Sequence, residues 1–150
     1  MSFRVVEIYN DPEPVTVVLW VSRHKPLPVQ IQRLKEKLGN IRIIQVDGTV
    51  PNAETVVEIA QKHNAKIIVP VLPLSFIARL VELSKRYGFT VLYAKMEAIA
   101  TVGTWEEAKR IIEEAPDRRT ATTYADGTIK IHEFKGFEVI KAVQIVTEPW

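Results

Sequence analysis

The chain has 150 residues, of which 47% are hydrophobic and 25% are charged, and it contains no cysteine. This length suits one domain over residues 1–150, and the lack of cysteine excludes disulfides, thiolate metal sites and cysteine nucleophiles. A formal charge of +2 is too balanced for a protein that binds duplex DNA. No apolar run approaches the ~20 residues that cross a bilayer, and the acidic N-terminus lacks a signal-type apolar core, so we expect a cytoplasmic protein without membrane contact.

The first two thirds of the chain alternate between predicted strands and predicted helices. Short apolar runs indicate buried strands, and apolar residues at helical spacing indicate helices. In chain order these elements are strand 3–9, strand 15–21, helix 28–38, strand 41–46, helix 52–63, strand 66–72, helix 74–87 and strand 89–95. Pro28 in a first turn, Asn52 as a cap, and Gly39 and Gly88 after last turns mark the helix ends. The alternation predicts a mostly parallel sheet with right-handed crossovers and helices on both faces.

The pattern changes after residue 95. Residues 96–104 are predicted to form a loop, and a helix follows over 104–115 with Thr104 and Glu107 as a capping box. Asp126-Gly127 predicts a turn in a hairpin over 120–134, and residues 136–150 predict one more long strand. The predicted class is therefore α/β, a three-layer Rossmann-like fold with a mostly parallel sheet and a C-terminal β-hairpin extension.

Ligands of open parallel sheets gather beyond the carboxyl ends of the strands. Four segments should meet at that edge: residues 22–25, 46–52, 70–75 and 94–104. The candidate ligand-contacting residues in them are Ser22, Arg23, His24, Lys25, Gly48, Thr49, Leu72, Pro73, Ser75, Lys95, Thr101, Gly103 and Thr104.

The first of these segments, Ser22-Arg23-His24-Lys25, carries the most chemistry. The planar guanidinium of Arg23 suits a phosphate, the imidazole of His24 can pass protons, and Ser22 supplies a small donor or acceptor. The alternative is that Arg23 and Lys25 are only solvated and that His24 satisfies a local carbonyl.

The other candidates have simpler alternatives. Ser75 lies in the first turn of a predicted helix, where free N–H groups attract anions, or it only caps that helix. Lys95 borders the same cavity or is solvated. Thr101, Gly103 and Thr104 lie in a loop that would cover a ligand, although the capping box alone explains Thr104.

Several features favour structural roles or exclude whole classes of site. Arg118 and Arg119 fit a solvated hairpin edge better than a phosphate clamp, His63 ends a helix, and His132 is expected to be exposed on a strand. The sequence has no HExxH motif, no clustered carboxylates, no GxGxxG, no P-loop and no GxSxG elbow. We therefore expect no metal and no cofactor.

Three short pieces of the chain, together about a third of it, resemble a known family. A strand running into Val21-Ser22-Arg23-His24, a later Val71-Leu72-Pro73-Leu74-Ser75, and the segment 126–141 (DGTIKIHEFKGFEVIK) are similar to those of small CRISPR-associated Rossmann-fold (CARF-like) proteins, the stand-alone ring nucleases in particular. The family has threonine where this chain has Ser22, and the predicted helix 104–115 has no counterpart in it.

The resemblance implies a homodimer around cyclic oligoadenylate, most often the four-adenylate ring, and an enzyme that ends type III CRISPR signalling by degrading this messenger. The implied chemistry is attack of a ribose 2′-hydroxyl on the adjacent phosphorus, without a metal. Arg23 would then balance phosphate charge, His24 would transfer protons, and Ser22 would orient the ribose or phosphate. Ser75 and its helix would hold a neighbouring phosphate, with Lys95 as a secondary cation.

Three other functions stay open at the level of the sequence. The same pocket would serve a sensor or sponge that binds the cyclic nucleotide without cutting it. A structural protein would instead pair its late hairpin with another chain, and an ordinary small-molecule enzyme is the third alternative, because this class of fold supports many chemistries.

Overall fold

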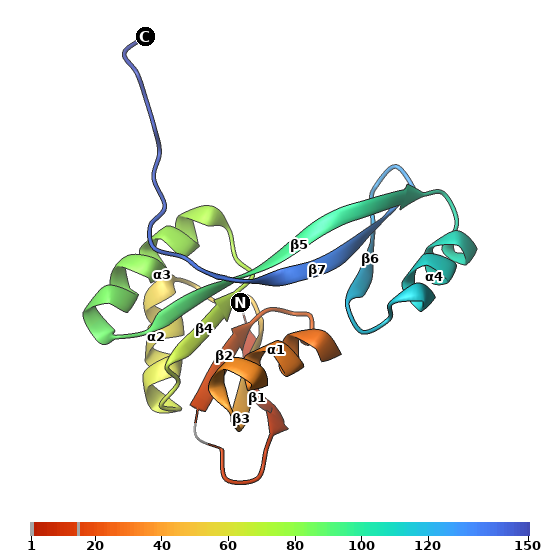
Figure 1. Ribbon diagram of the computed structural model, residues 1–150. Helices are drawn as coiled ribbons and strands as arrows, with labels where there is room; N and C mark the ends of the chain where they lie inside the picture. The colour runs from red at the N-terminus through yellow and green to blue at the C-terminus, as the bar shows by residue number, and fades with distance from the viewer. Residues whose placement is uncertain (1, 15) are drawn as a thin grey trace. The chain divides into compact units, whose positions relative to one another are not determined.

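The structure is a computed structural model that describes residues 2–14 and 16–150. These residues form four α-helices and one mixed sheet of seven strands, hydrogen-bonded in the order β1-β3-β2-β4-β5-β7-β6 (Figure 1). The strands are β1 Phe3–Asn10, β2 Thr16–Val21, β3 Ile41–Gly48, β4 Ile67–Pro70, β5 Thr90–Val102, β6 Arg119–Thr123 and β7 Ile129–Val139. The helices are α1 Pro28–Leu38, α2 Ala53–Lys62, α3 Leu74–Tyr87 and α4 Trp105–Glu114. None of these helices is both long enough and apolar enough to cross a bilayer.

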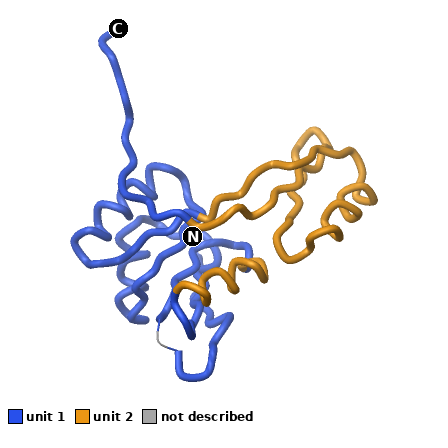
Figure 2. The backbone as a smooth tube through the Cα atoms, viewed as in Figure 1, with its two compact units in different colours: residues 1–25, 38–93, 138–150 blue, residues 26–37, 94–137 orange. Residues whose placement is uncertain are grey.

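The chain divides into two compact units (Figure 2). Unit 1 contains residues 1–25, 38–93 and 138–150, and unit 2 contains residues 26–37 and 94–137. Each unit is assembled from segments that lie far apart in the sequence. The single domain over residues 1–150 stays a prediction.

Unit 1 contains the parallel part of the sheet. β2 pairs in parallel with β3 on one side and with β4 on the other, β4 pairs in parallel with the start of β5, and β1 pairs antiparallel with β3. The α/β class with a parallel core is thus confirmed. The chain goes from β2 to its neighbour β3 and then crosses to β4 on the opposite side of β2, and such a reversal opens a crevice at the carboxyl ends of the strands.

The core of unit 1 lies between its strands and the helices α2 and α3. Leu19, Ile44 and Ile68 are buried in one apolar cluster with Val56 of α2 and Leu80 of α3. The helix ends were predicted correctly because they depend on local chemistry. The Asn52 side chain accepts the Thr55 N–H at 2.8 Å and begins α2, and Gly88 ends α3 in the left-handed conformation.

Unit 2 joins α4 to a hairpin made by β6 and β7. Ala108 of α4 is buried against Ile129 and Ile131 of β7. The predicted capping box is confirmed, because the Thr104 hydroxyl accepts the Glu107 N–H at 3.3 Å. The hairpin is also confirmed, and residues 124–128 connect its strands from Thr123, which pairs with Ile129.

Two predictions for the last third of the chain were wrong. Residues 96–102 are not a loop, because β5 continues to Val102, where it gains β7 as a neighbour in the sheet and packs Ala100 and Val102 against the apolar cluster of unit 2. Residues 136–150 are not a separate strand. β7 passes through Gly136, which adopts a φ of 143°, and ends at Val139, and residues 140–150 have no regular structure.

Candidate functional site

A cavity of about 360 Å³ opens at the carboxyl ends of β2, β3 and β4 in unit 1. We call it the carboxyl-edge cavity. Its residues come from the ends of three strands and from the first turn of α3, and none of them is acidic: Val21, Ser22, Arg23, His24, Gly48, Thr49, Val50, Val71, Leu72, Pro73 and Phe76. Three of the four predicted segments, 22–25, 46–52 and 70–75, therefore meet at one site.

The loop after β2 is held in place by hydrogen bonds on both sides. The Ser22 hydroxyl accepts the His24 backbone N–H at 3.1 Å, and the Ser22 carbonyl accepts Nε2 of Gln45 at 2.8 Å. The indole N–H of Trp20 donates to the His24 carbonyl at 2.9 Å. Ser22 itself is buried, and within the described residues its hydroxyl donates to no protein acceptor, so the hydroxyl proton can be donated to a group in the cavity.

Arg23 is exposed and has a hydroxyl as its partner. One guanidinium nitrogen, Nη2, donates to Oγ1 of Thr49 at 3.1 Å. Within residues 2–14 and 16–150, no carboxylate pairs with Arg23 or with Lys25. The charge of Arg23 is therefore unneutralised by the protein, and its remaining N–H donors are available to an anion.

Gly48 allows the loop that carries Thr49 to lie against the start of β1. The Thr49 N–H donates to the Ser2 carbonyl at 3.1 Å. A Cβ on Gly48 would lie 2.5 Å from that same oxygen and 2.9 Å from the Phe3 Cα, and the φ of Gly48 is +117°. Glycine is therefore required here by close approach and by backbone conformation together.

The N-terminus of α3 borders the same cavity. The Val71 N–H donates to the Val21 carbonyl at 2.8 Å, which ties the segment to β2. Pro73 is the N-cap residue and offers no capping side chain, so the first-turn N–H groups of this helix lack a side-chain acceptor and add a positive potential at the cavity. Phe76, one turn further, lines the cavity, whereas Ser75 is exposed and does not.

Five other predicted residues do not line the carboxyl-edge cavity. Lys95, Thr101, Gly103 and Thr104 belong to unit 2, because β5 does not end at Lys95 but continues to Val102. Lys25 lines a different cavity of unit 1.

Sequence reasoning missed the apolar wall of the cavity. Val50 is almost fully buried, Phe76 is half-buried, and Val71 exposes 59% of its surface at the rim. Phe76 follows Pro73, the N-cap residue of α3, by three residues, so helical spacing alone would have placed the two on one side of the helix start. The exposed apolar side chain of Val71, beside charged groups, suits a ligand that has both an apolar ring and a charged part.

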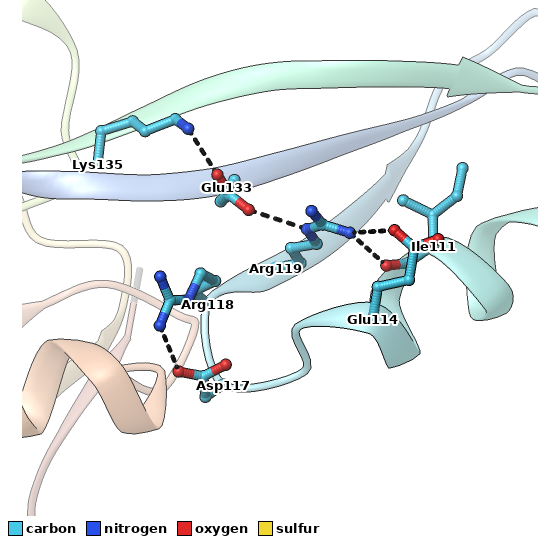
Figure 3. A network of polar contacts seen from close by, with 7 residues as sticks. All are labelled: Ile111, Glu114, Asp117, Arg118, Arg119, Glu133 and Lys135. Atoms are coloured by element: carbon cyan, nitrogen blue, oxygen red, sulfur yellow. Dashed lines mark hydrogen bonds and ion pairs between the residues drawn. The ribbon is translucent and has the colours of Figure 1, made fainter.

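The arginine pair in unit 2 has a different environment (Figure 3). Arg119 Nε donates to Glu133 at 3.0 Å, and Nη1 donates to Glu114 at 3.0 Å and to the Ile111 carbonyl at 2.7 Å. Its side chain is only 17% exposed, so Arg119 is not the solvated residue that was expected. Arg118 fits that expectation, since it is 45% exposed and pairs with its neighbour Asp117 at 3.2 Å.

The ionisable groups of this network shift each other's equilibria. Hydrogen bonds from Lys135 and then from Arg119 hold the pKa of the Glu133 carboxyl below its usual value. The hydrogen bonds to Glu133 and Glu114 raise the pKa of the Arg119 guanidinium. Among the residues that the structure describes, no group of three histidine, aspartate or glutamate side chains is arranged to hold a metal ion.

No protein-family model matches the chain, and no curated protein matches it. A solved structure from Rickettsia typhi, described as a "Putative Hydrolase", is similar to it with a TM-score of 0.37 and 9% sequence identity, over 89% of this chain and 72% of that one. A similarity of this size establishes neither a shared fold nor a shared activity.

Proposed function

We propose that the carboxyl-edge cavity binds cyclic oligoadenylate, with the four-adenylate ring as the preferred ligand, and cleaves it as a ring nuclease. One observation carries this proposal. A guanidinium, an imidazole, a hydroxyl and a helix N-terminus come together around a cavity whose lining contains no carboxylate. Such a set of donors attracts a phosphate, and the imidazole adds a group that moves protons.

The strand order supports the finer fold that the sequence resemblance implies. In chain order the parallel strands β2, β3, β4 and β5 take the spatial order β3-β2-β4-β5, which is the start of a doubly wound sheet. The cavity lies where the order reverses, between the ends of β2 and β4. We therefore propose a three-layer, Rossmann-like (CARF-like) domain with the β6–β7 hairpin as its extension.

The proposed reaction is a transesterification within the ring. The ribose 2′-oxygen forms a bond to the adjacent phosphorus, and the bond from phosphorus to the 5′-oxygen breaks. His24 accepts the 2′-hydroxyl proton, and the 5′-oxygen takes up a proton from the imidazolium or from water. The products are a 2′,3′-cyclic phosphate and a 5′-hydroxyl, so no co-reactant is consumed.

Each of the other groups has a role in the charged transition state. The guanidinium of Arg23 faces the two negative charges of the phosphorane, where a fixed cationic donor is most effective. The Ser22 hydroxyl donates to a phosphate oxygen, and its hydrogen bond from His24 keeps the three residues in register. Positioning of the 2′-oxygen in line with the leaving group lowers the activation barrier by several kcal/mol more.

The volume of the cavity favours a homodimer. A space of about 360 Å³ is at the small end of the range of ~300–1,000 Å³ for small-molecule sites. A ring of four nucleotides exceeds it, so one subunit would enclose only part of the ring. Two copies facing each other would enclose the whole and would place one Arg23 and one His24 on each side.

The proposal is tested by incubating the pure protein with radiolabelled cyclic tetra-adenylate in the presence of EDTA. Linear products with 2′,3′-cyclic phosphate ends support the nuclease. If the ring stays intact and the protein retains it tightly, the protein is a sensor or sponge and not a nuclease. If the ring is neither bound nor cleaved, the proposed relationship to the ring nucleases is wrong.

The role of His24 is tested by His24→Ala, with His63→Ala as the control because His63 ends α2, away from the residues that line the cavity. Loss of a general acid–base group should lower kcat by ~10²–10⁴-fold, while ring affinity changes only a few-fold. The measurement is single-turnover cleavage across the pH range in which imidazole titrates. Equal rates for His24→Ala and the unaltered protein at every pH would exclude proton transfer by this residue.

A further inference from the structure

A second cavity of about 410 Å³ adjoins the candidate site within unit 1. We call it the β1 cavity, because β1 supplies half of its lining. Its charged residues are Arg4, Glu7, Arg23, Lys25 and Asp47. Arg23 lines both this cavity and the carboxyl-edge cavity, so the two spaces share one residue.

The register of β1 and β3 explains why these residues share one space. Arg4 pairs with Asp47, and Val6 pairs with Gln45, across the antiparallel ladder. Side chains alternate along a strand, so Gln45 and Asp47 lie on the face opposite Val46, which is buried in the core with α2 and α3. The loop after β2 then brings Arg23 and Lys25 to the end of that face.

The cationic side chains of the β1 cavity form only weak ion pairs, or none, with carboxylates of the described residues. Arg4 and Asp47 approach to 3.4 Å, but their side chains are 78% and 33% exposed, and such surface pairs contribute little to stability. Glu7 is engaged by Arg42 on β3. Lys25 has no carboxylate partner within residues 2–14 and 16–150, and Gln45 is held by the Ser22 carbonyl.

We infer that the β1 cavity is a second phosphate subsite, in which Lys25 and Arg4 hold the phosphate next to the one that is cleaved. This inference rests on the proposed function, since it assigns a second group of the same ligand. Arg23 lies between the two phosphates and contacts whichever carries the larger charge during the reaction. The preferred substrate class is therefore an oligonucleotide with at least two adjacent phosphates, and a mononucleotide leaves this subsite empty.

The test compares Lys25→Gln with Lys66→Gln, which removes an exposed lysine just before β4, at the opposite end of the parallel strands. The probe is cyclic tetra-adenylate with 2′-O-methyl riboses, which cannot undergo 2′-hydroxyl attack. Its affinity is measured over a series of salt concentrations. Lys25→Gln should weaken binding by about tenfold and should reduce the slope of log K against log salt by about 0.7, the value for one phosphate contact on a single strand.

A second variant, which is expected to change the binding affinity in the opposite direction, makes the test more specific. Asp47→Asn removes the carboxylate that competes for Arg4 and repels phosphate, so it should strengthen binding a few-fold while Lys66→Gln leaves it unchanged. If the unaltered protein binds the probe but Lys25→Gln and Lys66→Gln behave alike, the subsite is wrong and the proposed function stands. If the unaltered protein does not bind the probe, both are wrong.

Discussion

Arg23 in unit 1 and Arg119 in unit 2 are the same residue type in opposite circumstances. Arg119 is largely buried and donates to two carboxylates and a backbone carbonyl. Arg23 is exposed and donates to a threonine hydroxyl. The protein satisfies Arg119 with its own groups, whereas it leaves most of the donors of Arg23 for something else.

The difference indicates which arginine serves structure and which serves a ligand. A guanidinium surrounded by acidic groups and a carbonyl gains its hydrogen bonds on folding and links α4 to β6 and β7 (Figure 3). A guanidinium whose charge is not neutralised gains most of its hydrogen bonds only when an anion arrives. From the sequence alone, Arg118 and Arg119 were predicted to lie at a hairpin edge and Arg23 was predicted to bind a phosphate. Only the hydrogen-bond partners seen in the structure distinguish a structural arginine from a ligand-binding one.

Among the changes that separate the two arginines, Arg23→Ala has the largest expected effect, and this effect is on activity. Loss of the fixed cation at the phosphate should lower turnover by ~10²–10³-fold and should also weaken ring affinity, while the melting temperature stays the same. Cleavage and binding of cyclic tetra-adenylate are the measurements. Arg86→Ala, an exposed arginine in the last turn of α3, is the control. A fall in melting temperature as large as that of an Arg119 variant would end the contrast between the two arginines.

The next effect is on stability and comes from Arg119→Met. This change leaves Glu133, Glu114 and the Ile111 carbonyl without their common donor, so the melting temperature should fall by a few degrees. Arg118→Met removes a more exposed pair with Asp117 and should change it much less. Thermal unfolding followed by circular dichroism measures both variants, and equal shifts would show that the network contributes nothing beyond a surface pair.

The smallest effect is a pH dependence that Glu133→Gln removes. The pKa of Glu133 is lowered in the folded protein from its ordinary value of 4.5, chiefly by Lys135 and then by Arg119. Its stabilising contribution is therefore complete above that value and is lost as the pH falls through the lower folded pKa. The unaltered protein should melt at a higher temperature than Glu133→Gln at neutral pH, with the difference closing in acid.

A second carboxylate provides the internal reference for this titration. Hydrogen bonds from Thr128 lower the pKa of Asp126, and this group is present in both proteins, so its titration cancels in the difference. A gap in melting temperature between the unaltered protein and Glu133→Gln that stays constant down to low pH would contradict the assignment to Glu133.

Local chemistry in the sequence determined the helices, the first strands and most of the residues that line the carboxyl-edge cavity. Proline in a first turn, asparagine and threonine at N-caps, and glycine after last turns act within a few residues, so α1, α3 and the caps of α2 and α4 were predicted correctly. The segment 22–24 was predicted because polar residues directly followed an apolar strand. None of these features depends on residues far away in the chain.

Tertiary structure alone decided how far β5 extends and therefore which predicted residues share the cavity. Whether residues 96–102 form a loop or a strand depends on β7, a neighbour some thirty residues later in the chain, whose hydrogen bonds no local pattern records. That pairing carries Lys95 and Thr101 into unit 2. The pairing of Arg4 with Asp47 across the antiparallel ladder likewise needed the fold, because contacts between distant residues are specified by packing and register rather than by short-range propensity.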